Sequence, residues 1–556
     1  MTDTNSSLGS SAAAWRIGTT GIALIAMLPV LAIVWLALFP SENIWPHLVS
    51  TVLPRYLSNT VILMVGVGIS VFLIGVSTAY LVSTYVFPGQ QYFAWLLILP
   101  LAVPAYVIAY LYTDLLEFAG PVQTMIRGLF GWELARDYWF PNVRSMGGAI
   151  ILMGLVLYPY VYLMARASFL EQSPHLLDVS RLMGRSQFNT FLFVSLPIAR
   201  PGIAIGIALA LMETLNDFGT VDYFAIHTLT AGIFDVWLNM NNLGGAAQIA
   251  IVMLTFVLLL IGLEYIGRKR IGFYQSVGRF TRIEKIQLTG LAKWAAFMVC
   301  FVPVLAGFFI PVGMLINYGI TYFEQSWTEQ FREYALNSLS VSIIAAICCI
   351  VIAVFVSYAK RIEGNAWLGS ASKLASMGYA VPGAVLAVGV IIPLAVFDNA
   401  VDGFFRAQFG VSTGLILSGT TFALILTYVI RFLAISIGSI ESSFSKISTS
   451  IDMAARTLGH PPFRTLRRYH LPLIKSGIFT AALIVFVDCM KELPATLLLR
   501  PFNFETLATH VYLFAADEMI EQSALGALFI VLCGLIPVIV LSKTISSSQV
   551  LVRQPN

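Results

Sequence analysis

Long apolar stretches alternate with short polar segments along nearly the whole chain. Most of these stretches reach the roughly 20 residues that an α-helix needs to cross the hydrocarbon core of a bilayer. The pattern therefore predicts an all-α polytopic membrane protein with about twelve transmembrane helices. We expect these helices near residues 17–39, 57–86, 93–113, 146–166, 198–216, 246–266, 294–318, 337–359, 374–396, 413–435, 476–494 and 523–542.

The composition agrees with a membrane protein. Of the 556 residues, 58% are hydrophobic and 11% are charged, whereas a soluble domain would carry about twice that charged fraction. The five cysteines lie in apolar stretches without the spacing of metal ligands, so we expect them to be small buried side chains. Neither GxxxxGKS nor GxxxxGKT, the loops that cradle phosphates in many ATPases, occurs. If ATP drives this protein, another polypeptide must hydrolyse it.

The basic residues predict the orientation of the chain. If the N-terminus is cytoplasmic, the inner side holds 24 of the 32 Lys and Arg residues, as the positive-inside rule requires. The outer side then holds 20 of the 28 Asp and Glu residues. An even number of spans brings the C-terminus back to the cytoplasm as well. We therefore expect a multi-pass membrane protein with both termini cytoplasmic and no nucleic-acid partner.

Matching residues recur at two constant distances, which indicates an internal repeat. The matches 275 residues apart are Gly184 with Gly459 and Pro197 with Pro472, and those 278 apart are Asn59 with Asn337 and Val103-Pro104 with Val381-Pro382. Each half contains six predicted spans, so the two halves share one orientation. A parallel repeat of this kind implies a pseudo-two-fold axis along the membrane normal, and duplicated bundles usually enclose a pathway.

The repeat also predicts the organisation of the chain. Two repeat cores are joined by a basic cytoplasmic linker, and each core is preceded by one extra helix. The expected segments are an N-terminal tail with the first helix and outer loop (1–56), the first core (57–267), the linker (268–293), the seventh helix and its outer loop (294–336), the second core (337–545) and a C-terminal tail (546–556).

Two polar segments on the predicted inner side have the same punctuation. They read DVSRLMGRSQFNTFLFVSLP at 178–197 and DMAARTLGHPPFRTLRRYHLP at 452–472. In each, a short helix is expected to end at a glycine that permits a chain reversal, and a Leu-Pro pair precedes the next apolar stretch. A single copy is compatible with a solvated basic loop. Two copies with identical spacing favour a docking element for a cytoplasmic partner.

The spacing of Gly to Leu-Pro resembles the EAA signature of permease subunits in ATP-binding cassette importers. The resemblance implies a MetI-like importer permease fold, in which these segments contact the ATPase subunits, and two fused halves imply two ATPase copies. The implied coupling residues are Asp178, Val179, Ser180, Gly184, Leu196 and Pro197 in the first segment and Asp452, Ala454, Ala455, Gly459, Leu471 and Pro472 in the second. The pattern departs from the family where Met453 replaces its acidic residue and where Val179 and Ser180 replace its two alanines.

Carboxylates follow each Leu-Pro at the far end of the next predicted span. They are Glu213 and Asp217 in the first half and Asp488 and Glu492 in the second, and each pair is spaced i, i+4 on one helix face. Acidic groups at membrane depth are costly and usually functional, and hard cations prefer oxygen ligands. We therefore consider these four side chains to be candidates for a substrate pathway. The alternative is that they only end helices and pair locally, for example with Lys491.

Two longer strings narrow the resemblance. DCMKELPATLLLRPFNFETLAT and ETLNDFGTVDYF look like the permeases of ferric iron importers, which receive Fe(III) from a periplasmic binding protein. The resemblance implies a location in the bacterial inner membrane, a chain that holds no cofactor and catalyses no reaction, and an ATPase partner that uses the ATP. If iron is the substrate, Asp217 and Glu492 are the carboxylates that we expect to bind the metal transiently. Fused permeases for thiamine, polyamines and phosphonates share the architecture and remain alternatives.

A secondary transporter driven by a proton or sodium gradient is the alternative from another class. Paired carboxylates suit ion coupling, and parallel repeats occur in such transporters too. The duplicated docking segments distinguish the two classes, because a secondary transporter has no need of an ATPase contact.

Overall fold

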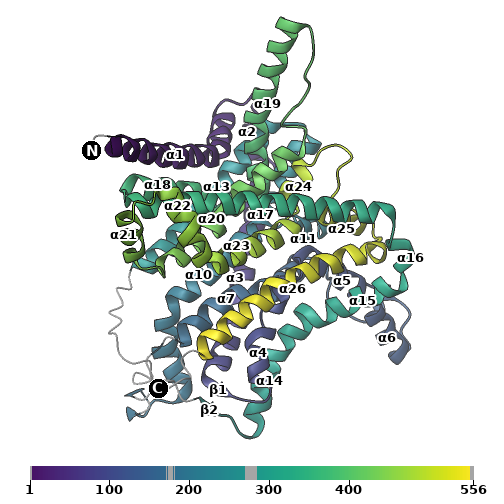
Figure 1. The fold of residues 1–556 in the computed structure, drawn as a ribbon. Helices are drawn as coiled ribbons and strands as arrows, with labels where there is room; N and C mark the ends of the chain where they lie inside the picture. Colours follow the sequence, from purple (N-terminus) through teal and green to yellow (C-terminus); the bar gives the residue numbers. More distant parts are fainter. Residues whose placement is uncertain (1–2, 171, 173–178, 181, 270–284, 551–556) are drawn as a thin grey trace. The chain divides into compact units, whose positions relative to one another are not determined.

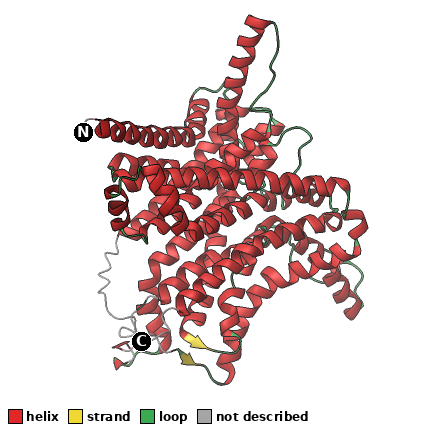
Figure 2. Cartoon of the chain, viewed as in Figure 1, coloured by secondary structure: helices red, strands yellow, loops and turns green. Residues whose placement is uncertain are grey.

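The computed structural model describes residues 3–170, 172, 179–180, 182–269 and 285–550 (Figure 1). Helices make up most of these residues, as Figure 2 shows, and the two strands β1 (Tyr85–Val86) and β2 (Ile286–Gln287) pair in parallel over two residues each. Asp178 and most of the basic linker 268–293 lie outside the described residues. The prediction of an all-α polytopic membrane protein is confirmed.

Ten of the described helices or helix runs are long and apolar enough to cross a membrane, and an eleventh is a bent pair. The ten spans are Ala13–Leu38, Leu53–Thr84, Met146–Leu170, Gln187–Asn216, Leu243–Gly262, Gly290–Thr321, Glu329–Glu363, Gly383–Phe409, Thr421–Ser445 and Pro462–Met490. The twelfth expected span falls on α26 (Ile520–Val550), whose apolar part is counted over Glu521–Pro537. Every predicted span therefore coincides with helical structure.

The third predicted span, 93–113, is not one straight helix. It consists of Gln90–Ala102 and Ala105–Phe130, which meet at an angle of 90°. Val103 has an extended backbone, and Pro104, which has no N–H to donate, precedes the second helix. The matching Val381 is extended too. The same dipeptide thus interrupts the helix in both halves, and the ninth span begins at Gly383, later than the predicted 374.

The chain forms two compact units, and each unit contains segments from both halves of the sequence. Unit 1 comprises residues 1–46, 233–251 and 328–510, and unit 2 comprises residues 47–232, 252–327 and 511–556. The chain passes between the units within or beside α2 (Trp45–Ser50), α12 (Leu229–Phe234), α13 (Leu243–Lys269), α16 (Phe323–Ser326) and α25 (Leu507–Ala516).

Unit 1 contains the first helix together with the helices of the second half. Its elements are α1 (Asp3–Leu38), η4 (Asp235–Asn239), α17 (Glu329–Glu363), α18 (Ala366–Ala375), η6 (Met377–Ala380), α19 (Gly383–Phe409), α20 (Thr421–Ser445), α21 (Thr449–Thr457), α22 (Pro462–Thr465), η7 (Leu466–His470), α23 (Leu471–Met490) and α24 (Pro494–Leu499). Here α17, α20 and α23 pack on one another, and α1 packs on α17, α18 and α19.

Unit 2 contains the first-half helices, the seventh span and the last helix. Its elements are α3 (Leu53–Thr84), β1, α4 (Gln90–Leu96), η1 (Leu99–Ala102), α5 (Ala105–Leu116), α6 (Pro121–Phe130), η2 (Ala135–Asp137), α7 (Met146–Leu170), α9 (Gln187–Thr190), η3 (Phe191–Ser195), α10 (Leu196–Asn216), α11 (Gly219–Tyr223), β2, α14 (Gly290–Val304), η5 (Leu305–Phe309), α15 (Ile310–Thr321), α16 and α26. Its centre is the packing of α3 on α7 and of α10 on both.

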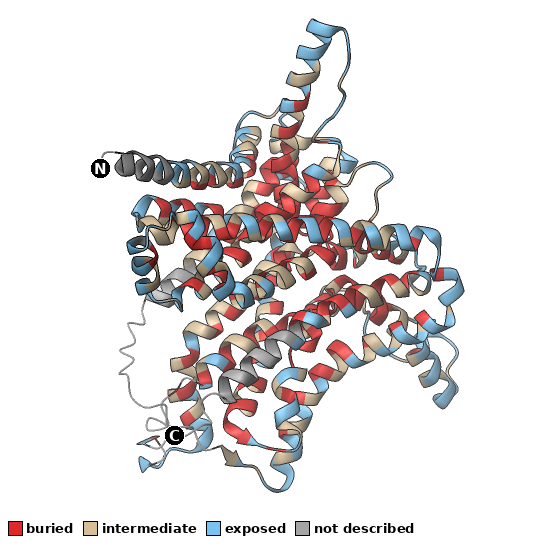
Figure 3. Ribbon diagram, viewed as in Figure 1, coloured by how far each residue is buried: buried red, intermediate tan, exposed pale blue. Residues whose placement is uncertain are grey.

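Buried residues gather on the helix faces that contact other helices, as Figure 3 shows. In unit 1, one cluster surrounds Tyr358, Ile440 and Phe444, and another surrounds Ala345, Tyr428 and Val485. Ile347 and Val351 on α17 are exposed and apolar. Such a surface suits a helix whose outer face meets lipid, because hydrocarbon does not penalise apolar exposure.

Hydrogen bonds at equivalent positions confirm the repeat. The Asn59 side chain donates to the His227 carbonyl at 3.0 Å, and the Asn337 side chain donates to the Glu505 carbonyl at 3.1 Å. In both halves the next hydroxyl also accepts a backbone N–H. These bonds join Leu229 to Thr60 and Leu507 to Ser338. Each half therefore ties the equivalent loop to its second span.

Candidate functional site

The segment 452–472, which we name the second elbow, is a short helix, a reversal and a tight turn into α23. At the end of α21, the Leu458 N–H donates to the Ala454 carbonyl and the His460 N–H donates to the Ala455 carbonyl. Gly459 has φ +74° between these two donors. A residue with a Cβ would be strained there, so the sequence needs glycine at this reversal.

The elbow enters α23 through a π-helical turn, η7. The Leu471 N–H donates to the Leu466 carbonyl, five residues back. Pro472 follows and has no N–H to donate to the Arg468 carbonyl four residues earlier, so a normal α-helical bond is missing at this point. The Leu-Pro pair thus fixes the turn between the elbow and the membrane helix.

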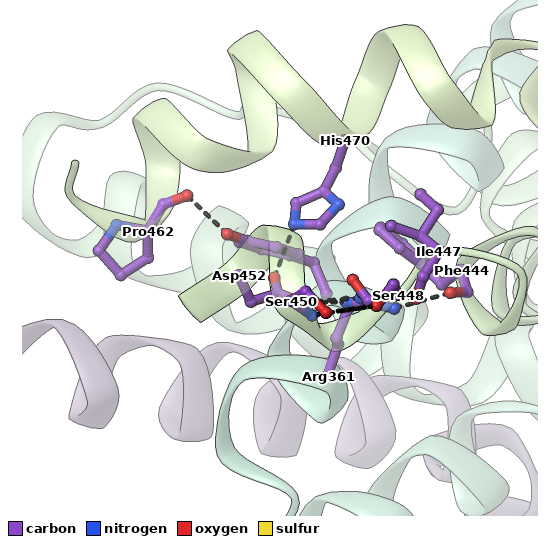
Figure 4. Close-up of polar contacts among 9 residues, drawn as sticks. Arg361, Phe444, Ile447, Ser448, Ser450, Asp452, Pro462 and His470 are labelled. Atoms are coloured by element: carbon purple, nitrogen blue, oxygen red, sulfur yellow. Dashed lines mark hydrogen bonds and ion pairs between the residues drawn. The ribbon is translucent and has the colours of Figure 1, made fainter. Parts of the chain in front are cut away.

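A charged cluster ties the second elbow to the ends of α17 and α20 (Figure 4). The Arg361 guanidinium donates to Asp452 Oδ2 from Nη2 at 2.7 Å and from Nε at 3.0 Å, and to the carbonyls of Phe444 and Ile447 at 2.7 and 3.0 Å. His470 Nε2 lies 2.7 Å from Asp452 Oδ1. Burial alone would raise the pKa of Asp452, but the bonds from Arg361 and His470 outweigh burial and hold that pKa below its ordinary value. Asp452 is therefore an anion at neutral pH, and His470 donates to it.

Aromatic packing reinforces the same attachment. The fully buried His470 ring lies 5.5 Å from the ring of Tyr358 and 5.7 Å from that of Phe444. The Tyr358 hydroxyl also donates to the Pro462 carbonyl at 2.7 Å. The side of the second elbow that contacts α17 and α20 is thus fixed to unit 1.

Elsewhere on the second elbow, large apolar side chains are exposed. Met453, Leu458 and Phe463 are 59%, 70% and 66% exposed. Basic residues adjoin them, since Arg467 and Arg468 are also exposed. An exposed apolar surface with a basic rim is suited to contact another protein.

The first elbow, residues 178–197, repeats this geometry where it is described. Gly184 has φ +77°, and the Leu196 N–H donates to the Phe191 carbonyl through the π-helical turn η3. Leu182, Met183 and Phe188 are strongly exposed. All twelve predicted coupling residues except Asp178 fall on these two elbows within the described residues, and their contact with an ATPase stays a prediction.

Glu492 lies in a buried ion pair immediately before α24. Its Oε1 accepts from Arg431 Nη1 at 3.0 Å and from the Ala495 N–H at 3.2 Å, and its Oε2 accepts from the Thr496 N–H and hydroxyl at 3.1 and 2.9 Å. Both side chains are almost fully buried. The carboxylate thus caps α24 and neutralises a cation at the same time.

The sequence did not indicate Arg431 as a partner. Our orientation count placed it among the inner-loop cations, but it lies inside α20 and is 5% exposed. The position of Arg431 within the predicted span 413–435 could have indicated a partner, because an arginine at membrane depth needs a counter-charge. Gly383 makes room for the pair, since a Cβ there would lie 2.4 Å from Arg431 Nη1 and 2.5 Å from Glu492 Oε1.

Asp217 caps the short helix α11 in the same way as Glu492 caps α24. Its Oδ1 accepts from the Thr220 N–H at 2.9 Å, and its Oδ2 accepts from the Thr220 hydroxyl at 3.0 Å. The residue 275 positions before Arg431 is Val156. For the described residues, the structure shows no ion pair at Asp217. The two matched carboxylates therefore share a fold role but differ in charge balance.

The other two candidate carboxylates, Glu213 and Asp488, are less buried than Glu492. Asp488 lies 3.0 Å from Lys491 Nζ in a partly exposed ion pair, and the matching Glu213 is partly exposed. Among the described residues, no three His, Cys, Asp or Glu side chains gather as a metal site would need. Asp217 belongs to unit 2 and Glu492 to unit 1, and their binding of a metal stays a prediction.

Comparison with known proteins identifies relatives of both halves. Residues 71–272 match the family of binding-protein-dependent transport system inner membrane components. An Fe(3+)-transport system permease protein of Haemophilus influenzae is 28% identical over 495 residues, 88% of this chain and 89% of that protein. A ferric transport system permease protein of Actinobacillus pleuropneumoniae is 22% identical over 85% of this chain and 69% of its own length. A molybdenum transport system permease protein of Escherichia coli is 27% identical over 36% of this chain and 87% of its own length.

Proposed function

From the presence of a binding-protein-dependent inner membrane transport domain at residues 71–272, we propose that this chain is the fused transmembrane subunit of an ATP-driven importer of ferric iron. We choose ferric iron as the substrate because the relatives named for it match a larger share of the chain than the others. The relatives named for ferric iron match 83 to 88% of the chain, whereas those named for molybdenum and for spermidine and putrescine match 32 to 36%. Iron is thus the substrate of the relatives that share both halves.

The two elbows are the proposed contacts for two copies of a cytoplasmic ATPase subunit. Each presents exposed apolar side chains on a turn built around a left-handed glycine. An ion-gradient transporter has no use for such paired surfaces, so this geometry supports the importer. The ATPases supply the hydrolysis, and this chain couples it to movement.

The contacts of α1 support a cytoplasmic N-terminus. Arg16 pairs with Glu363 at 2.5 Å, and Glu363 lies at the same end of α17 as Arg361, which binds the second elbow. The N-terminus and the second elbow are thus at one end of unit 1. If the elbow meets an ATPase in the cytoplasm, the N-terminus is cytoplasmic too.

The second elbow is connected directly to a carboxylate at the far end of α23. This helix runs for 20 residues from Leu471 to Met490, about 30 Å at 1.5 Å per residue. Glu492 and α24 follow immediately. Because a packed helix moves nearly as a rigid body, displacement of the elbow by an ATPase would displace the outer end as well. The matching path in unit 2 runs through α10 to Asp217 and α11.

Transport into lipid vesicles tests the proposal. The chain is reconstituted with its ATPase subunit, ATP is enclosed on the elbow side, and the binding protein loaded with radioactive Fe(III) is added on the other side. We expect iron to accumulate only when ATP, the ATPase and the binding protein are all present, with no accumulation of molybdate or spermidine. Uptake driven by an imposed proton or sodium gradient without the ATPase would contradict the proposal.

A further inference from the structure

Among the described residues, the two elbows differ in the charge of the side chains that hold them. Arg361, Asp452 and His470 form the cluster in the second half. The residues at the matching positions of the first half are Ser83, Leu177 and Ser195, none of which is ionisable. Ser83 and Ser195 are buried, and among the described residues their hydroxyls have no hydrogen-bond partner.

The surroundings of the cluster are otherwise preserved. Tyr358 and Phe444 match Tyr80 and Phe169, and the rings are in contact in both halves, with centroids 6.1 Å and 5.4 Å apart. Both elbows also keep the left-handed glycine and the π-helical turn. At these described positions, the difference therefore lies in the groups that bear charge.

In the described part of the first elbow, hydrogen bonds between uncharged groups take the place of the ion pairs of the second. The hydroxyls of Ser180 and Thr190 lie 3.0 Å apart, and the Gln172 side chain donates to the Ser195 carbonyl at 2.8 Å. In the second elbow, the planar guanidinium of Arg361 joins α21 to the last turn of α20 and the segment after it. Hydrogen bonds between ions in a partly buried site are shorter and stronger than those between neutral groups. Because the guanidinium of Arg361 is planar and donates through several N–H groups, it fixes the orientation of Asp452 as well as its distance.

We propose that Arg361, Asp452 and His470 are positioning residues that lock the second elbow to unit 1, so that the two coupling elbows are mechanically unequal. This inference rests on the proposed function. The second elbow passes ATPase movement directly to α17, α20 and α23. The first elbow, whose hydrogen bonds among the described residues join uncharged groups, transmits the movement less completely. Removal of the lock would uncouple ATP hydrolysis from transport and leave the apolar docking surface intact.

A spectroscopic test on the full-length solubilised chain needs neither substrate nor ATPase. Leu458 and Met183 are 275 residues apart and similarly exposed, at 70% and 73%, so each can carry a nitroxide label through a single introduced cysteine after Cys348, the partly exposed native cysteine, is replaced by serine. We expect the label at 458 to gain mobility in Asp452→Asn and in His470→Ser. The label at 183 should be unaffected by the matched variant Ser195→Ala.

A coupling test in vesicles gives the functional readout. We expect Asp452→Asn to lower the iron imported per ATP hydrolysed by roughly tenfold, with the ATPase still bound, and Asp452→Glu to restore part of the loss. Ser195→Ala should leave the ratio unchanged. If Asp452→Asn fails to assemble, Arg361→Lys keeps the charge, loses the fork and should give a smaller loss.

The outcomes separate the two proposals. An unchanged ratio and unchanged label mobility in Asp452→Asn would overturn the lock while leaving the importer intact. An equal loss in Ser195→Ala would also overturn it, because the elbows would then be equivalent. A wild-type chain that never imports iron with its ATPase would instead contradict the proposed function, and the label experiment would still decide whether the lock exists.

Discussion

The Glu492 carboxylate accepts four hydrogen bonds, one from Arg431 and three from Ala495 and Thr496 in the first turn of α24. Lipid around the helices offers neither charge an alternative partner. Breaking such a pair is costly because the remaining ion is buried without compensation. The pair therefore fixes the position of α24 against α20 more firmly than apolar packing alone.

Arg431→Met should destabilise the chain by about 3–5 kcal/mol, because Glu492 is left buried and unpaired. The measurement is the unfolding midpoint of the purified chain in a denaturing-detergent titration. Lys491→Met is the control, since it breaks a partly exposed pair that should contribute about 1 kcal/mol or less. Equal shifts in the two variants would show that the Arg431–Glu492 pair has no special weight.

Gly383→Ala should disturb the same pair by crowding. The added Cβ would lie 2.4 Å from Arg431 Nη1 and 2.5 Å from Glu492 Oε1, and overpacking of this kind costs about 1–3 kcal/mol. Gly403→Ala on the same helix meets nothing within 4 Å and should be neutral or slightly stabilising. The same titration checks both variants, and a neutral Gly383→Ala would mean that the pair moves aside freely.

At the scale of elements, the elbows depend on backbone geometry that only glycine adopts easily. Gly459→Pro should abolish ATP-dependent iron uptake, because proline holds φ near −65° and the reversal needs +74°. The chain should still insert in the membrane, since α20 and α23 are unaffected. Uptake in vesicles at matched protein levels is the measurement, and Gly438→Ala within α20, which meets nothing within 4 Å, is the control. Normal uptake by Gly459→Pro would remove the elbow from the coupling path.

The elements that the sequence predicted well are those with a long hydrophobic signal. In lipid, only a helix satisfies the backbone of a 20-residue apolar run, so helices stand at all twelve expected places. The break at Val103-Pro104 was missed, because proline is tolerated in many transmembrane helices. The short helices α11 and α24 were missed because five or six residues are too few to show the hydrophobic periodicity of a helix. The pairing of Arg431 with Glu492 spans 61 residues, and no spacing rule connects side chains on different helices.

At the scale of the whole molecule, the halves keep one backbone plan and diverge in charge. The same loop hydrogen bonds, helix caps and π-helical turns recur in both. Arg431 is buried and Arg361 is half-buried, and the first half has Val156 and Ser83 at the matching positions. The duplicated chain thus has one half braced by ion pairs and one half whose matching carboxylate, Asp217, has no cation beside it among the described residues.

This difference predicts unequal roles for the two capping carboxylates in iron transport. Asp217→Asn removes a carboxylate without stranding a cation, so a loss of uptake would report on the substrate path. The variant should lower the rate of iron uptake by roughly tenfold, as for loss of one charge-assisted ligand, while assembly with the ATPase is retained. Glu492→Gln alone would strand Arg431, so the informative partner is the double variant Glu492→Gln/Arg431→Gln, in which both charges leave together. We expect this double variant to affect uptake less than Asp217→Asn, because Glu492 is already neutralised by Arg431.

Glu133→Gln, which removes an exposed carboxylate of the predicted outer loop, controls for the general negative charge of that face. Wild-type uptake by Asp217→Asn in vesicles with normal protein content would exclude Asp217 from the path of the metal.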